Sequence, residues 1–424
     1  MKPLLLAVAA TALLAGCATA GGQQQPAQGA QAQQQPSRPR VEDPYPSTYR
    51  PYPGVVTAIT NATIYDGEGG RIDNGTIVLA EGRILAVGGA DTAIPEGATR
   101  IDGNGRWVTP GVIDIHSHQP TPISAADFDR VMKGMEQNNL RILVNLSGGS
   151  AARLASGIEA IKNSKYPDRM VLFANVDFPR EGVGPGFGVK AAAQLEADIK
   201  AGAKGLKIFK DLGLRVRKAD GTRLKLDDPE LDPIWAACGR LGVPVLIHTA
   251  EPQEFFEPID FKNERWLELA LFSSRRLPPD QAPRFEELIG ERDRMFERHP
   301  KTKFIAAHFA YHANNLGRMG KLMDRLPNLH TEGGAILAEL GRQPRAAHDF
   351  FVKYQDRILF GKDSYQPDEY PYYWRTFETA DEYFDYYRDY HAFWKLYGIG
   401  LPDAVLRKVY RDNALRVVKG LPKS

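Results

Sequence analysis

Four histidines and one aspartate stand at the ends of apolar segments in this sequence. His116 and His118 follow a β-branched run, and His248, His308 and Asp363 each end a later run. Alternate side chains of a strand share a face, so His116 and His118 are expected to project together. Imidazoles and carboxylates are the usual protein ligands of zinc-like ions. The set predicts a metal site, although each histidine taken alone would equally suit a packed core or a loop start.

A lysine lies inside another apolar run, Leu206-Lys207-Ile208. Burying an ammonium group is costly unless it is neutralised, modified or paired, so Lys207 predicts a special environment. Lys210 has the opposite strand parity and is expected nearer the following loop. Asp114 is expected on the face of His116, where a carboxylate could orient an imidazole. His330 and Glu332 share a face of another segment and are weaker candidates for the site.

Eight apolar segments alternate with helical patterns after residue 110, which is the signature of repeated βα units. The predicted strands are 111–118, 139–147, 169–177, 204–210, 243–249, 302–309, 327–332 and 356–363. We therefore expect an α/β fold, a (β/α)8 TIM barrel whose functional residues gather at the strand C-terminal ends. Short strands and Gly/Asn/Asp turns between 55 and 108 predict a small antiparallel sheet before it.

The charge balance excludes some classes of partner. The chain has 54 basic and 52 acidic residues and no basic tract with interleaved aromatics, which argues against nucleic-acid binding. A small-molecule substrate is expected instead. Two long insertions rich in aromatics, 251–288 and 364–394, follow strands at the active face and are expected either to form walls of a pocket or to pack a lid or homo-oligomer contact. Tyr365 of the second insertion and Arg342, which precedes that insertion, are the substrate-binding candidates, although Arg342 would equally suit a helix cap.

The N-terminus has the organisation of a secretion signal. A charged Lys2 and a short apolar stretch precede Leu14-Ala15-Gly16-Cys17, and the stretch is too short to span a bilayer. This segment resembles the bacterial lipobox, which implies cleavage before Cys17 and acylation of its thiol. Ala18 then favours the outer membrane, with the protein facing the periplasm. The alternative is an ordinary signal peptide with an incidental cysteine.

Four domains are expected from these patterns. They are a signal peptide with lipobox (1–17), a disordered Gln/Ala/Pro tether (18–53), a β-rich lead-in (54–109) and the barrel (110–424). Cys238, the second cysteine, sits in an apolar helical pattern and is expected to be buried packing.

The lead-in resembles the opening of the amidohydrolase superfamily, and is similar to that of imidazolonepropionase. The segments that carry this resemblance are 61–67, Gly82-Arg83-Ile84 and 108–118. Segments of the barrel, such as Leu246-Ile247-His248-Thr249 and Ile358-Leu359-Phe360-Gly361, resemble the branch containing aminocarboxymuconate-semialdehyde decarboxylase and related hydrolases. The resemblance implies a small β-sandwich before the barrel, incomplete here because the chain ends in a helical pattern.

The resemblance also implies roles for the strand-end residues. His116, His118, His248 and Asp363 would hold zinc or another divalent transition metal. Lys207 and His308 would complete a second site, with Lys207 either carboxylated and bridging two ions or a plain lysine beside one. Asp363 would take a proton from the metal-activated water, and His308 would be a ligand or a base. Lys362 stands where relatives have a small hydroxyl residue, a departure that leaves the substrate class open.

These features predict a metal-dependent hydrolase of amide, cyclic amide, ester or lactone bonds. Two alternatives stay open at this point. One is a metal-dependent, non-oxidative decarboxylase, and the other is a non-catalytic lipoprotein that binds a ligand.

Overall fold

The structure is a computed structural model that describes residues 55–66, 70–80, 83–109 and 111–422 of the 424-residue chain. Cys17, the signal segment and the expected tether lie outside the described residues. None of the helices in the described part of the chain combines the length and the apolar character needed to cross a bilayer.

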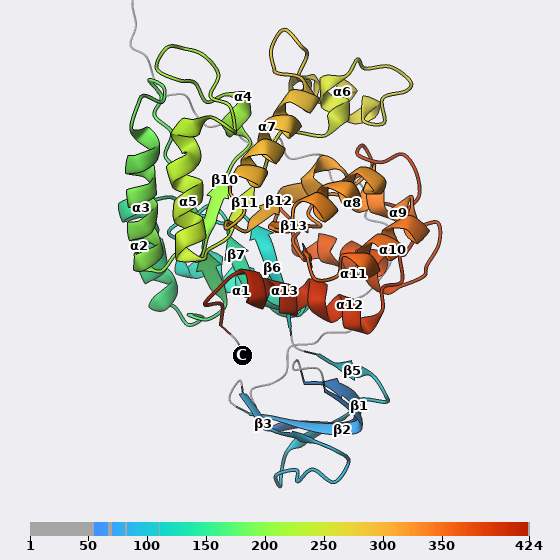
Figure 1. Ribbon diagram of the computed structural model, residues 1–424. Helices are drawn as coiled ribbons and strands as arrows, with labels where there is room; N and C mark the ends of the chain where they lie inside the picture. Colours follow the sequence, from blue (N-terminus) through green and yellow to red (C-terminus); the bar gives the residue numbers. More distant parts are fainter. Residues whose placement is uncertain (1–54, 67–69, 81–82, 110, 423–424) are drawn as a thin grey trace, which may run out of the picture. The chain divides into compact units, whose positions relative to one another are not determined.

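A five-stranded mixed sheet forms the N-terminal part of the described chain (Figure 1). Its strands are β1 (Thr57–Tyr65), β2 (Arg71–Ala80), β3 (Arg83–Gly88), β4 (Thr99–Asp102) and β5 (Trp107–Val108). The hairpins β1–β2 and β2–β3 are antiparallel, but β4 and β5 both pair with β1 in parallel. The expectation of an antiparallel sheet is therefore wrong, because the segment after β3 returns to the far side of β1 instead of making a third hairpin. The described residues contain this single β layer where a small sandwich was expected.

The remaining strands form an α/β barrel. They are β6 (Val112–Ser117), β7 (Leu140–Asn145), β8 (Met170–Leu172), β9 (Ala174–Asn175), β10 (Leu206–Ile208), β11 (Val245–Ile247), β12 (Phe304–Ala306), β13 (Leu329–Glu332) and β14 (Ile358–Leu359). Two parallel sheets, β6-β7-β8 and β9 through β14, are separated only by Phe173. The backbone N–H of Ile115 donates to the Phe360 carbonyl at 3.1 Å, and Ser117 forms a parallel bridge with Asp363. The last strand is thus joined to the first.

Each predicted barrel strand is present but shorter than expected. His118, His248, His308 and Asp363 lie just beyond strand ends, whereas His116 and Lys207 lie within strands. After β12 the four residues His308 to Tyr311 all have left-handed backbone, with φ between 52° and 56°. This conformation costs roughly 1–2 kcal/mol for each non-glycine residue. The segment is held where two of its side chains, His308 and Tyr311, border the same cavity.

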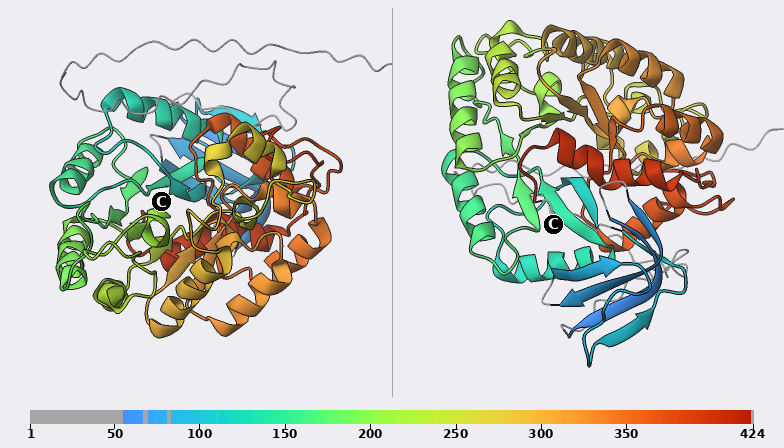
Figure 2. Two further views of the ribbon diagram at one scale, coloured as in Figure 1. Left: turned by 90° about the horizontal axis from the view of Figure 1, so that it is seen from above. Right: turned by 60° about the horizontal axis from the view of Figure 1, so that its bottom comes forward.

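Helices follow the barrel strands and lie on the outside of the strand ring (Figure 2). The α-helices are α1 (Ala125–Gln137), α2 (Ala151–Lys162), α3 (Phe187–Ala201), α4 (Asp211–Leu214), α5 (Asp232–Leu241), α6 (Trp266–Leu271), α7 (Phe285–Arg298), α8 (Leu316–Arg325), α9 (Leu337–Gly341), α10 (Pro344–Lys353), α11 (Tyr370–Glu378), α12 (Asp403–Arg407) and α13 (Asn413–Val417). The short helices α4, α6 and α9 and several single turns lie in the loops that build the site.

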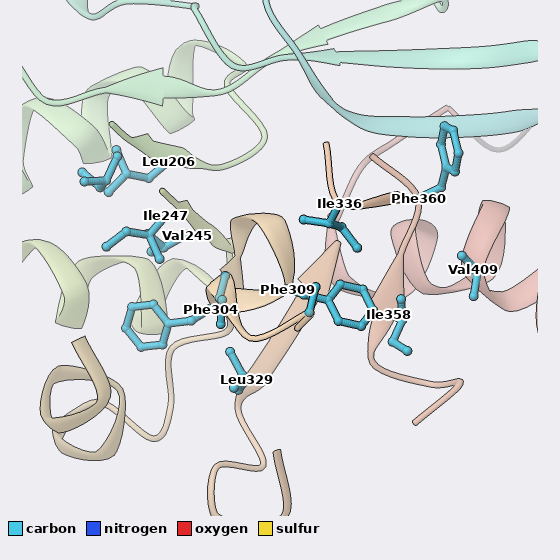
Figure 3. Packing of buried hydrophobic residues seen from close by; sticks show 14 of the residues in the cluster. Leu206, Val245, Ile247, Phe304, Phe309, Leu329, Ile336, Ile358, Phe360 and Val409 are labelled. Atoms are coloured by element: carbon cyan, nitrogen blue, oxygen red, sulfur yellow. The ribbon is translucent and has the colours of Figure 1, made fainter. Parts of the chain in front are cut away.

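Alternation along the strands divides the barrel core into two layers. Leu206, Val245, Ile247 and Phe304 belong to the layer between strands and helices (Figure 3), where Cys238 of α5 is also buried as predicted. Residues of the opposite parity, such as Leu246, form the second layer. Lys207 pairs in register with Leu246, so the lysine takes a place on the inner face of the strand.

Candidate metal centre and active-site cavity

Two histidines and an aspartate converge at the junction of the first and last barrel strands. The Oδ1 atom of Asp363 lies 3.3 Å from His116 Nε2 and 3.7 Å from His118 Nε2. One ligand atom from each of the three residues lies within 4.8 Å of the other two. Two nitrogens and one carboxylate oxygen at this spacing form a ligand set suited to a divalent transition metal.

The second nitrogen of each imidazole is held by another side chain. His116 Nδ1 lies 3.0 Å from Glu332 Oε1, and His118 Nδ1 lies 2.8 Å from Ser147 Oγ. A carboxylate can only accept, so the hydrogen of His116 sits on Nδ1 and its Nε2 lone pair faces the junction. His116 Nε2 is buried and has no hydrogen-bond partner among the described residues. A metal ion would satisfy this nitrogen, so the residues present fit the metal that the pattern implies.

Glu332 is the support of this centre. Its Oε1 also accepts from the backbone N–H of His308 at 2.8 Å, and its Oε2 accepts from the N–H of Gly334 at 2.6 Å. With three donors already on its two oxygens, the fully buried carboxylate is better suited to orient ligands than to bind a metal itself.

Asp114 does not orient an imidazole, which corrects the sequence-based expectation. A register irregularity between Asp114 and Ser117 breaks the strict alternation along β6. Asp114 instead accepts from the hydroxyl of Tyr370 at 2.6 Å and from the backbone N–H groups of His116 and Lys362. Burial raises the pKa of Asp114 to about 7, and these donors limit the rise.

Asp363 enters the site from a strained backbone position. Its φ is 82°, and its N–H donates to the His116 carbonyl at 2.7 Å, which locks the turn against β6. Asp is one of the few residues that tolerates such a conformation. Burial acts to raise the pKa of Asp363, but the four surrounding imidazoles outweigh burial and lower it. The carboxylate is therefore ionised at neutral pH.

Lys207 is buried beside this centre. Its Nζ has no hydrogen-bond partner in the part of the chain that the structure describes. Burial lowers the pKa of Lys207 to about 8, and the charges of Asp363 and Glu332 partly oppose the shift. A fraction of the amine is thus unprotonated near neutral pH, as metal binding or carboxylation requires.

His248 and His308 form a pair next to the first group. The Nδ1 of His308 donates to the Gly334 carbonyl at 2.7 Å, which leaves its Nε2 3.3 Å from His248 Nδ1. The other nitrogen of His248 lies 2.8 Å from the Tyr311 hydroxyl. The ring of His308 also lies 5.2 Å from that of His116, centroid to centroid. The structure thus places His248 with His308 rather than in the group of His116, His118 and Asp363.

Burial keeps these imidazoles neutral. It lowers the pKa of His118 and of His248 to about 4 in each case, and it also lowers the pKa of His116 well below its usual range. Charge from Lys207 acts in the same direction on all three. Neutral imidazoles are the form that binds metal, so at pH 7 these nitrogens do not need to lose protons first.

A cavity of about 230 Å³ opens beside His248, His308 and Asp363. Both insertions contribute walls to it, which is one of the two roles that the sequence left open, and these walls carry many charged groups beside the aromatic Phe255. The cavity is bordered by Lys210, Arg265, Arg275, Arg388, Glu251, Glu254, Glu268 and Glu339. The expected aromatics Tyr370 and Tyr373 are instead buried in the core.

Neither substrate-binding candidate from the sequence borders this cavity. Arg342 is paired with Glu264 at 2.6 Å and lies over the ring of Trp394. The hydroxyl of Tyr365 donates to the carbonyl of Val131. Arg342 is held by a neighbouring carboxylate and Tyr365 by a backbone group, and sequence spacing alone does not reveal such contacts.

The Amidohydrolase family (Amidohydro_2) matches residues 113–420. A short segment is 52% identical over 56 residues to imidazolonepropionase of Stenotrophomonas maltophilia (strain R551-3), covering 12% of this chain and 14% of that enzyme. The curated relatives of this kind are therefore matched over only a small part of their length.

Solved structures with a similar fold share little sequence. A. niger ochratoxinase is 14% identical, with a TM-score of 0.45, covering 86% of this chain and 85% of that one. A 2,6-dihydroxybenzoate decarboxylase complexed with 2,6-dihydroxybenzoate is 17% identical, with a TM-score of 0.42, and the match covers 73% of this chain and 99% of that one.

The barrel, the cluster of imidazoles and carboxylate, and the family match define an enzyme of the amidohydrolase superfamily with a candidate site for a divalent metal. The chain belongs to the Amidohydrolase family, as the sequence resemblance predicted. The family match counts against the non-catalytic alternative, whereas the expected lipid anchor on Cys17 lies outside the described residues.

Proposed function

We propose that the protein is a metal-dependent hydrolase that cleaves an amide, cyclic amide, ester or lactone bond in a small polar substrate. The observation that supports this most is the convergence of His116 Nε2, His118 Nε2 and Asp363 Oδ1, with the far nitrogens of both imidazoles held in place. A hydrolase needs such a centre next to a cavity, and Asp363 borders both.

The residues that would hold the ion are His116, His118 and Asp363, with His248, His308 and Lys207 available for a second one. When bound, a divalent ion supplies a Lewis acid that makes water nucleophilic near pH 7 and polarises a carbonyl group. The ionised Asp363 carboxylate then has the position and charge to accept a proton from the attacking water and to deliver it to the leaving group.

Hydrogen bonds from neighbouring residues hold His116 and Asp363 in position. Glu332 fixes the orientation of His116, and the N–H of Asp363 donates to the His116 carbonyl, so the base and the ligand are directly linked. Charged groups line the cavity and are largely paired with each other, which favours a polar substrate over an apolar one.

Decarboxylation is a second candidate, favoured by Arg388 in the cavity wall. A guanidinium group binds carboxylates well, and a carboxylate could be either the leaving group or a recognition handle. The products separate the two reactions, because only decarboxylation releases CO2.

The test is a screen of the zinc-loaded enzyme with small amides, lactams, esters, lactones and aromatic carboxylates. Asp363→Asn should lower the hydrolysis rate by about 10²–10⁴-fold, the usual contribution of a positioned acid–base group. Asp349→Asn on α10 is the matched control and should leave the rate unchanged. Release of CO2 without hydrolysis of any member of the screen would favour the decarboxylase.

We also propose that the mature enzyme is anchored by a lipid on Cys17 to the bacterial outer membrane and faces the periplasm. The lipobox-like segment Leu14-Ala15-Gly16-Cys17 supports this proposal. Cys17→Ser should abolish incorporation of labelled palmitate and release the enzyme from the membrane fraction. Unchanged fractionation of the variant would contradict the anchor.

A further inference from the structure

Four cationic side chains border the active-site cavity, and three of them are neutralised. These three form hydrogen bonds and ion pairs with cavity carboxylates: Lys210 with Glu251, Arg265 with Glu268 and Glu339, and Arg275 with Glu268. Each of the three therefore donates at least one hydrogen bond to a carboxylate of the cavity wall.

Arg388 is the fourth cation, and it differs from the others. Its guanidinium group makes no hydrogen bond with any residue that the structure describes. It lies 3.8 Å from Glu369 and 5.3 Å from the centre of the Tyr387 ring. Glu369 already accepts a hydrogen bond from the buried Lys362 at 2.5 Å. Two cations therefore share one carboxylate, and the N–H donors of Arg388 remain available to a ligand in the cavity.

The shape and charge of Arg388 select the chemistry of its partner. A guanidinium group offers five N–H donors in a planar fork that matches a carboxylate in a two-bond geometry. The Tyr387 ring lies beside this fork, 5.3 Å from ring centre to the guanidinium carbon. The carboxylates Glu254, Glu268 and Glu339 on the same cavity disfavour a doubly charged phosphate relative to a singly charged carboxylate.

We propose that Arg388 is the anchor for a carboxylate group of the substrate. The cavity of about 230 Å³ holds both Arg388 and Asp363, so a small molecule can reach both. Resting on the proposed hydrolase function, this assigns the substrates to small amides or lactams that carry a carboxylate away from the scissile bond, such as N-acyl amino acids. Arg388 takes the role that the sequence had suggested for Arg342.

Binding is the direct test, because it does not depend on turnover. A panel of N-acetyl amino acids is titrated calorimetrically against the corresponding carboxamides, which are neutral and nearly the same shape. Inorganic phosphate is titrated as a third probe. Each titration uses the zinc-loaded protein and the same protein after chelator treatment, because a carboxylate can also bind a metal directly.

The wild-type protein should bind acids of the panel more tightly than the matching carboxamides, both with and without metal. Arg388→Gln should weaken binding of the acids by about 10–100-fold and leave the carboxamides unchanged, since hydrogen bonds to charged groups contribute at this level. Arg388→Lys should retain part of the preference. Arg342→Gln is the matched control, because Arg342 lies outside the cavity lining, and it should behave as the wild type.

Three results would overturn the proposal. They are no preference for acids over carboxamides in the wild type, a preference that survives in a folded Arg388→Gln protein, and tighter binding of phosphate than of any acid. Acids that bind through Arg388 without being hydrolysed would support the anchor and count against the hydrolase function. Thermal melts of both Arg388 variants show whether each is folded.

Discussion

Glu332 offers the sharpest test of how the metal centre is organised. Its two oxygens accept three hydrogen bonds, from His116 Nδ1, the His308 N–H and the Gly334 N–H. In Glu332→Gln one oxygen becomes an NH2 donor, so at least one N–H of this set must face another donor. The least damaging rotamer keeps the oxygen toward His116 and His308 and leaves the Gly334 N–H unpaired.

The cost follows from these contacts. A buried unpaired N–H costs about 1–3 kcal/mol, and loss of the charge weakens the two remaining bonds. We expect Glu332→Gln to lower the free energy of unfolding of the metal-free protein by about 2–4 kcal/mol. Because His116 is less firmly oriented, zinc affinity should fall by about 10–100-fold, which is typical for partners of metal ligands.

Urea unfolding measures the first quantity and competition with a chromophoric chelator measures the second. Glu297→Gln, an exposed carboxylate on α7 paired with Arg325, is the control and should change neither. Zinc affinity within twofold of the wild type in a destabilised Glu332→Gln protein would refute the reasoning, because Glu332 would then support the fold but not the metal ligands.

The other predictions concern metal number and acid stability. Lys207→Ala should lower the metal content of purified protein from about two ions per chain to about one, because Lys207 lies beside both the His116–His118–Asp363 group and the His248–His308 pair; one ion in both proteins would show a mononuclear site. For His312, burial and the charges of Arg292 and Arg318 lower the pKa to about 2. Between pH 6.5 and 5 only the unfolded chain therefore binds this proton. The free energy of unfolding decreases as the pH is lowered through this range, by at most about 2 kcal/mol from this group. His312→Leu should show a correspondingly shallower loss in urea unfolding at pH 7 and pH 5, and an unchanged slope would contradict the lowered pKa.

The sequence predicts the barrel and most of the site because both depend on local patterns. Apolar runs that end in His116, His248, His308 and Asp363 place these side chains at one end of parallel strands, whatever the details of packing. The inward position of Lys207 follows from strand parity in the same way. The family resemblance adds the roles of these residues.

What could not be predicted depends on backbone irregularities and long-range pairing. The register irregularity in β6 turns Asp114 toward Tyr370, and the left-handed segment from His308 to Tyr311 carries the Tyr311 hydroxyl to His248. Strand parity assumes regular geometry and reveals neither. In the sequence pattern Glu332 shares a strand face with His330, and this indicates its position. The pattern does not reveal the three N–H groups that donate to it.

Charge pairing in the loops was equally hidden. The sequence suggested Arg342 as a substrate ligand and gave no reason to choose Arg388. Only the structure shows that Glu264 neutralises Arg342, whereas Lys362 competes with Arg388 for Glu369. Which guanidinium group is left without a hydrogen bond to the described residues depends on how the loops fold.

The central claim is that distant segments meet around a divalent ion. Anomalous diffraction at the zinc absorption edge from crystals of the zinc-loaded protein tests it most directly. We predict a peak about 2.0–2.2 Å from His116 Nε2, His118 Nε2 and an Asp363 carboxylate oxygen, the distances usual for zinc. A protein that binds zinc elsewhere, with no peak between these three side chains, would contradict the account.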